Sequence, residues 1–258
     1  MKISRTFGPT IASVVATSVL AASAMADHPV ELVFPSEIEE VEAIFLSASK
    51  QPLVADQNLI KAELLKAYNA TDEPLEHRDS QSARVAESHA PEVLAGSTQN
   101  IMLWGPYAEL DPGHYLVIYR FQVTDPEAAH DDIFLDVSHN ACTRSGIRIK
   151  ASEQPAGKWR EVAVPVYLPE KMKLEYRVWP GGNAMALDRI YLFKVAPGPQ
   201  DEKRDEGLKD LPEGEPVPGR DDVVTSPHTD NPGQIDISGL KKGARVRCPY
   251  TGNYFRVP

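Results

Sequence analysis

Apolar and polar side chains alternate with a period of two between residues 57 and 196, and this pattern constrains the fold most. Along His114–Val123, apolar side chains occupy every second position from Tyr115 to Val123. Such alternation is typical of a β-strand with one face buried and the other turned to solvent. The same period recurs in four further segments, at residues 133–137, 147–150, 162–166 and 173–179.

Turn-forming residues separate these segments. Asp111-Pro112-Gly113 precedes one of them, and Pro180-Gly181-Gly182 follows another. Short strands with such turns between them predict an antiparallel sandwich, and about eight strands over roughly 140 residues are typical of a jelly roll. The chain is therefore predicted to be mainly β, with a jelly-roll β-sandwich in residues 57–196.

The first 26 residues have the three parts of a signal peptide. Lys2 and Arg5 are followed by an uncharged apolar run and then by Ala24-Met25-Ala26. The apolar run is about 15 residues, shorter than the roughly 20 that span a bilayer. We expect cleavage after Ala26 and a secreted or periplasmic protein, with no membrane span elsewhere.

Three shorter zones flank the sandwich. Residues 27–56 form an N-terminal zone in which a capping box at Ser36–Glu39 favours a short helix, with a strand as the alternative. Residues 197–232 contain seven Pro and ten Asp or Glu, a composition that predicts a disordered acidic linker. Residues 233–258 resemble two or three very short strands, and we expect a small C-terminal β-hairpin module there.

Charge and cysteine content exclude several classes of protein. The 27 Lys and Arg against 37 Asp and Glu give a net charge of −10, which argues against a general nucleic-acid binder. Two cysteines, Cys142 and Cys248, are too few for a disulfide scaffold or a cysteine zinc cluster, although they could pair with each other. The C-terminal module is the basic exception, and its cations predict either an anionic partner or a solvated face: Lys241, Lys242, Arg245, Arg247 and Arg256.

Several segments together resemble a known family. They are Leu59–Glu63, Trp104–Arg120, Phe134–Val137, Trp159–Val166, Leu174–Val178 and Leu187–Leu192. This part of the chain resembles carbohydrate-binding modules of families 6 and 35 and the wider galactose-binding-like sandwiches. The resemblance implies glycan binding without catalysis, in loops at one end of the sandwich.

The resemblance also implies a structural calcium ion held by carboxylates on the opening and closing strands. Glu63 and Asp188 match those positions. Lys61 stands where the family often has a further carboxylate, so this chain departs from the pattern there. Hard oxygen ligands suit calcium, but two carboxylates make a marginal site; the alternative is that Glu63 and Asp188 face solvent or pair with Lys or Arg.

Glycan recognition needs aromatic faces to stack on sugar rings and polar groups to bind hydroxyls. Trp179 falls on the polar face of its strand and is the strongest candidate, with Asn183 in the following loop as a polar partner. For Trp104 and Trp159 the alternative is core packing. Tyr107 is a further candidate ligand. Three more candidates lie at the end of the predicted strand 133–137, where the alternative is an ordinary turn with no ligand: Asp136, His139 and Asn140.

Three functions remain open at this point. The first is a secreted, non-catalytic sandwich that binds a glycan or polysaccharide. The second is an exported envelope protein that docks through its basic C-terminal module. The third is a small polysaccharide-active enzyme. The chain has no Gly-x-Ser-x-Gly, His-Glu-x-x-His or Walker motif, so we predict that it is not an enzyme.

Overall fold

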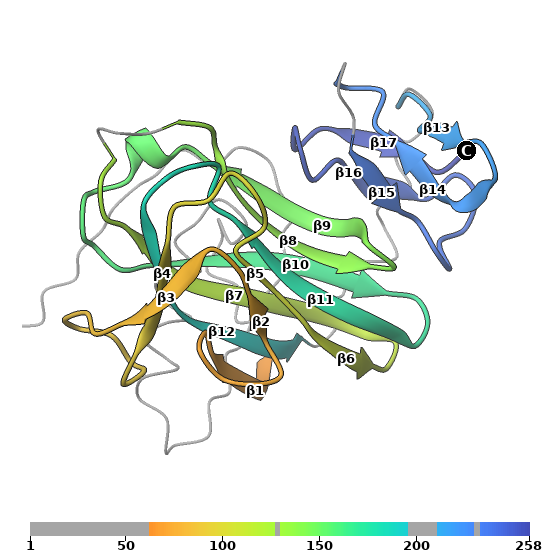
Figure 1. The fold of residues 1–258 in the computed structure, drawn as a ribbon. Coiled ribbons are helices and arrows are strands. Elements are labelled where there is room, and N and C mark those ends of the chain that lie inside the picture. The colour runs from red at the N-terminus through yellow and green to blue at the C-terminus, as the bar shows by residue number, and fades with distance from the viewer. Residues whose placement is uncertain (1–61, 127–129, 196–210, 230–232) are drawn as a thin grey trace, which may run out of the picture.

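The computed structural model describes residues 62–126, 130–195, 211–229 and 233–258 (Figure 1). The predicted signal peptide, the zone 27–56, and residues 197–210 and 230–232 of the predicted linker lie outside the described residues. In the described part, nearly all regular structure is β, and the one helix is a single 3₁₀ turn, η1 (Ala151–Glu153). None of the described helical structure is long and apolar enough to cross a bilayer.

One sheet of the sandwich, sheet A, has β7 and β12 at its centre. Its strands run antiparallel in the order β10-β7-β12-β4-β3, with β1 also paired to β12. The bounds are β1 (Ala62–Asn69), β3 (Ser80–Ala83), β4 (Val93–Gly96), β7 (Gly113–Val123), β10 (Arg160–Leu168) and β12 (Met185–Val195).

The other sheet, sheet B, carries the candidate site. Its order is β13-β14-β15-β9-β8-β11-β5-β2, and β6 pairs with β11. The bounds are β2 (Glu76–His77), β5 (Leu103–Trp104), β6 (Pro106–Leu110), β8 (Ile133–His139), β9 (Cys142–Ile149), β11 (Met172–Trp179), β13 (Glu215–Val217), β14 (Arg220–Thr225) and β15 (Gln234–Asp236).

The core lies between the two sheets and follows the predicted alternation. Val117, Tyr119 and Phe121 of β7 pack in one cluster with Leu135 of β8 and Tyr176 of β11, all of them fully buried. Successive residues of a strand point to opposite faces of the sheet. The residues that alternate with these core residues therefore lie on the outer faces of the two sheets. The mainly β sandwich and the C-terminal hairpin that the sequence predicts are confirmed.

The C-terminal part is larger than predicted, and residues 211–229 are not a tether. They contain β13 and β14, which extend sheet B through β15; β15 in turn runs parallel to β9, with Ile235 opposite Thr143. Figure 1 shows β13–β17 gathered at one side of the sandwich. The linker prediction rests on the acidic composition of the whole stretch and overlooks the short apolar pair Val223-Val224, both of which are buried.

The last two strands close the C-terminal unit, which we define as residues 211–229 and 233–258. β16 (Arg245–Arg247) and β17 (Tyr254–Arg256) form a hairpin whose Val246 and Phe255 face a small core with Val224 and Ile235. Cys142 and Cys248 are both buried and both free. The Cys142 thiol lies instead 3.5 Å from the Gln234 side-chain oxygen, so the two cysteines do not join the unit to the sandwich.

Candidate functional site

The site is built on the outer face of sheet B around β11, which pairs with β8 on one side and with β5 and β6 on the other. Leu174, Tyr176 and Val178 point into the core, so Glu175, Arg177 and Trp179 lie on the outer face. Trp179 is partly exposed at the end of the strand, as its place in the alternation predicts. The local period of two alone is therefore enough to present this indole at the surface.

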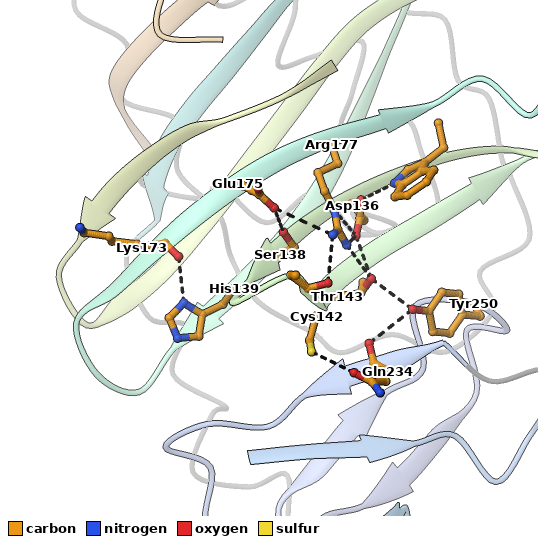
Figure 2. Close-up of polar contacts among 12 residues, drawn as sticks. Asp136, Ser138, His139, Cys142, Thr143, Lys173, Glu175, Arg177, Gln234 and Tyr250 are labelled. Atoms are coloured by element: carbon orange, nitrogen blue, oxygen red, sulfur yellow. Dashed lines mark hydrogen bonds and ion pairs between the residues drawn. The ribbon is translucent and has the colours of Figure 1, made fainter. Parts of the chain in front are cut away.

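A fully buried carboxylate, that of Asp136, holds Trp179 in place. Figure 2 shows Asp136 beside Arg177 and Thr143. Asp136 on β8 accepts hydrogen bonds from Trp179 Nε1 at 3.1 Å, Arg177 Nε at 3.1 Å and Thr143 Oγ1 at 2.8 Å. The Arg177 guanidinium also lies 5.6 Å from the centre of the Trp179 ring. Asp136 therefore positions the aromatic side chain, and its oxygens are occupied by protein donors.

The negative charge of Asp136 stabilises the charged form of Arg177. Burial by itself would lower the pKa of the Arg177 guanidinium, but the charge and hydrogen bonds of Asp136 outweigh burial and raise it above its ordinary value. Glu175 lies 3.9 Å from Arg177 and accepts a hydrogen bond from Ser138 Oγ at 2.7 Å. Asp136 of β8, Thr143 of β9 and Arg177 of β11 thus join the three strands on the face that carries Trp179.

A hollow of about 480 Å³ opens beside Trp179, where β8 begins and β11 ends. It combines aromatic surface with amide, imidazole, carboxylate and guanidinium groups. We call it the Trp179 hollow, and its lining residues are Gln99, His130, Asp131, Asp132, Phe134, Arg148, Trp179 and Gly181. Such a mixture of a flat apolar face and convergent polar groups is typical of small-ligand sites.

The predicted partner Asn183 shapes this hollow from beneath. Its side chain is fully buried and donates hydrogen bonds to the carbonyls of Asp131 and Pro180, both at 2.6 Å. It also accepts one from the His130 amide at 3.0 Å. Asn183 therefore holds the loop at His130 against the turn after β11, and it offers no exposed group to a ligand.

Trp104 and Tyr107 lie on the same outer face of sheet B. Leu103 is buried on the core side, opposite Val178. The next residue, Trp104, therefore points outward, and the Arg78 guanidinium lies 5.7 Å from the Trp104 ring. Tyr107 is 48% exposed. A hydrogen bond with Glu175 is the main cause that raises the pKa of the Tyr107 phenol to about 12. β5, β6 and β11 thus bring three of the predicted aromatic residues to one face.

The structure separates the other predicted ligands from Trp179. Trp159 belongs to the side of sheet A, where its Nε1 donates to the Ala86 carbonyl at 2.9 Å and the Arg120 guanidinium lies 5.0 Å from its ring. His139 and Asn140 lie at the opposite end of β8 from the hollow, in the turn to β9. His139 Nδ1 is 2.9 Å from the Lys173 carbonyl.

The two predicted calcium ligands do not fit a shared cation. Glu63 is exposed opposite Lys194, whereas Asp188 is fully buried at the other end of the β1–β12 ladder, next to Arg189. Asp188 accepts hydrogen bonds from Arg120 Nε at 2.8 Å and from the His89 and Ala90 amides. A guanidinium already neutralises this carboxylate, and no group of three or more metal-ligating side chains occurs in the described ranges.

Sequence reasoning missed two residues that matter in the hollow. Phe134 and Arg148 are opposite each other on β8 and β9, and the guanidinium lies 5.4 Å from the phenyl ring. Both fall on the outer face by the same alternation that identified Trp179. That signal was present in the sequence, but the pairing of β8 with β9 was needed to place them side by side.

Comparison with known proteins yields matches among solved structures. No protein-family model and no curated protein sequence matches the chain. A family 35 carbohydrate-binding module from Clostridium thermocellum matches with a TM-score of 0.40 and 16% identity, over 51% of this chain and 99% of the module. A carbohydrate-binding module of the Cellvibrio mixtus lichenase 5A, solved with cellotriose, matches with a TM-score of 0.38 and 14% identity, over 50% and 97%.

Proposed function

We propose that this chain is a secreted, non-catalytic protein that binds a glycan in the Trp179 hollow. The observation that carries the proposal is a partly exposed indole held rigidly at the edge of a polar hollow of about 480 Å³. The predicted cleavage after Ala26 supports a site of action outside the cytoplasm. The proposal rests on the geometry of this site.

The hollow offers the two kinds of contact that sugars require. The Trp179 ring presents a face on which the C–H groups of a pyranose can stack. Gln99, His130 and Asp131 line the same hollow and supply donors and acceptors for hydroxyl groups. Because Asp136 already fixes the indole, little side-chain entropy is lost when a ligand binds.

Two fully buried carboxylates of the sandwich, Asp136 and Asp188, are held in ion pairs. A general acid or base needs a titratable group that can reach the substrate. Asp136 is fully buried and paired with Arg177, and Asp188 is fully buried and paired with Arg120. Their oxygens accept hydrogen bonds from protein donors, so neither carboxylate reaches a ligand in the hollow, whereas His130, Asp131 and Asp132 line it.

A glycan array followed by calorimetric titration of the best oligosaccharide tests the proposal. We expect Trp179→Ala to weaken binding by roughly tenfold or more, because it removes the stacking face. Tyr167→Ala is the matched control, since Tyr167 is 47% exposed but lies on β10 of sheet A. Unchanged affinity in Trp179→Ala, or a blank array on folded protein, would exclude the hollow as a glycan site.

The same titration repeated with a chelator tests the role of calcium. We expect the affinity to stay the same, because Glu63 and Asp188 are separated along the β1–β12 ladder. A chelator that abolishes binding would instead require a metal site elsewhere in the chain.

A further inference from the structure

The outer face of the β16–β17 hairpin concentrates positive charge. Val246 and Phe255 are buried in the core of the C-terminal unit, so their neighbours in the two strands face outward. Arg245 and Arg256 are opposite each other in the ladder, and Arg247 follows two residues along. Lys241 and Lys242 stand exposed in the turn before β16. We call these five residues the hairpin cations.

Four of the hairpin cations have no carboxylate partner among the described residues, and of these Arg247 donates a hydrogen bond to the Gly252 carbonyl at 3.2 Å. Arg256 is paired with Glu213 at 3.2 Å and donates to the Leu211 carbonyl. Lys241, Lys242 and Arg245 form no ion pair within the described residues, and the Arg245 guanidinium lies 4.5 Å from the centre of the Tyr254 ring. These cations form a basic cluster in a chain whose net charge is −10. They leave a local positive potential for an external anion.

The spacing of these cations matches a polymer with separated negative charges. Residues opposite each other in an antiparallel pair have Cβ atoms about 5 Å apart, and residues two apart on a strand are about 7 Å apart. Duplex DNA is far denser, with one charge per about 1.7 Å, and needs a longer basic surface. A polysaccharide with one carboxylate or sulfate per sugar unit or two suits the hairpin better.

The hairpin also adjoins the Trp179 hollow through its own turn. Tyr250, in the turn between β16 and β17, stacks on Phe134 with the ring centres 5.3 Å apart. Arg148, which lines the hollow, lies 5.7 Å from the Tyr250 ring centre. The positive groups of the hairpin therefore stand on a unit that is anchored to the wall of the hollow.

We propose that the hairpin cations bind an acidic polysaccharide through its carboxylate or sulfate groups. Arginine and lysine recognise such groups by charge and by directed N–H donors, and the Tyr254 ring holds the Arg245 guanidinium in place. This surface is separate from the Trp179 hollow and does not depend on a ligand there. It gives the chain a second way to attach to a glycan.

Biolayer interferometry on the mature chain tests this, with immobilised polygalacturonate and heparin as the probes. Neutral dextran and duplex DNA serve as comparisons. We expect both acidic polysaccharides to bind at about 50 mM salt. Their affinity should fall steeply by about 200 mM salt, because binding releases counterions. The triple variant Lys241→Gln, Lys242→Gln, Arg245→Gln should bind roughly tenfold more weakly and with a shallower salt dependence.

The control variant carries the same change of charge on the sandwich, with Lys158→Gln, Lys171→Gln and Lys173→Gln. All six positions are exposed, so neither variant is expected to disturb the fold. The control should bind like the parent. Equal binding by both triple variants, absence of binding to either acidic polysaccharide at low salt, or tighter binding of DNA would overturn the proposal.

Trp179→Ala separates this proposal from the proposed function. It should keep the affinity for the acidic polysaccharides while losing the oligosaccharide that occupies the hollow. Loss of polyanion binding in Trp179→Ala, with full binding in the hairpin variant, would assign the polyanion to the hollow and overturn the hairpin proposal.

Discussion

Asp136 shows how a single buried residue can serve a surface site. Its carboxylate is 0% exposed and binds Arg177, Thr143 and Trp179 together. A buried ion pair adds little net stability, because desolvation offsets the attraction, but removing one partner leaves an uncompensated charge. The pair is best explained by the orientation that it imposes on the indole.

Asp136→Asn is therefore expected to destabilise the protein by about 3 kcal/mol, because the buried Arg177 guanidinium loses its hydrogen-bonded counter-charge and keeps only Glu175, at 3.9 Å. Urea unfolding followed by fluorescence measures this. Ser138→Ala on the same strand is the control and removes one hydrogen bond to Glu175, with an expected loss of about 1 kcal/mol. Similar losses in the two variants would refute the role given to the ion pair.

Tyrosine side chains make the stability sensitive to alkaline pH. The hydrogen bond with Glu175 raises the pKa of Tyr107 from 10.0 to about 12, and burial raises the pKa values of Tyr119 and Tyr176. The folded state thus keeps phenolic protons that the unfolded chain loses near pH 10. Since the folded pKa values are higher, this stabilisation is complete below pH 10 and is lost as pH rises through them.

We expect the unfolding free energy to fall steadily above pH 10, with the phenolate absorbance of the buried Tyr119 and Tyr176 appearing only as the protein unfolds. Urea unfolding at several pH values, together with absorbance at the phenolate band, checks both. In Tyr107→Phe the unfolding free energy should fall less steeply between pH 10 and pH 12, because the variant lacks one of the phenolic protons that the folded state retains. A flat stability profile above pH 10 would contradict the assignment.

At the scale of the element, the turn between β11 and β12 forms one wall of the hollow. Gly181 has a φ of +63° and Gly182 a φ of +82°, a region that side chains with a Cβ rarely adopt. A Cβ on Gly181 would lie 2.6 Å from the Asp132 carbonyl oxygen. The turn therefore needs glycine for its backbone conformation and for its close approach to the neighbouring loop.

Gly181→Ala is expected to cost more than about 2 kcal/mol and to weaken glycan binding, because the Asp132 loop has to move as well. Gly219→Ala is the matched control. Gly219 has a φ of +78° with no heavy atom within 4 Å of the added Cβ, so only the backbone cost of about 1 kcal/mol is expected. Thermal unfolding and oligosaccharide titration of both variants test this, and equal effects would rule out the steric argument.

At the scale of the whole molecule, the C-terminal unit is a continuation of sheet B. It is joined through β15 and β9, and Tyr250 donates a hydrogen bond to Thr143 Oγ1 at 3.1 Å (Figure 2). Thr143 in turn belongs to the network of Asp136. The sandwich and the C-terminal unit are therefore expected to unfold in one transition.

Tyr250→Ala should destabilise that single transition by about 2–4 kcal/mol, because it leaves a cavity beside Phe134. Tyr250→Phe keeps the ring and loses only the hydroxyl contact, for which about 1 kcal/mol is expected. Calorimetry of the mature chain distinguishes one transition from two. Two separate transitions in the unaltered protein would show that the C-terminal unit folds independently of the sandwich.

The sequence by itself determined the class of fold and the exposure of Trp179. Both depend on the alternation of side chains along a strand, which is a local property of the backbone. The apolar positions of β7 and β11 could therefore be assigned to the core from the sequence alone. The outward position of Trp179 followed from the same reasoning.

Only the tertiary structure decided which side chains meet. Asp136 and Arg177 are 41 residues apart in sequence, and Asp188 and Arg120 are 68 apart. Strand order and register set these contacts, and a local pattern carries no record of either. For that reason the sequence alone did not show that Asn183 is a buried support, that Glu63 and Asp188 lie towards opposite ends of the β1–β12 ladder, or that residues 211–229 contain two strands of sheet B.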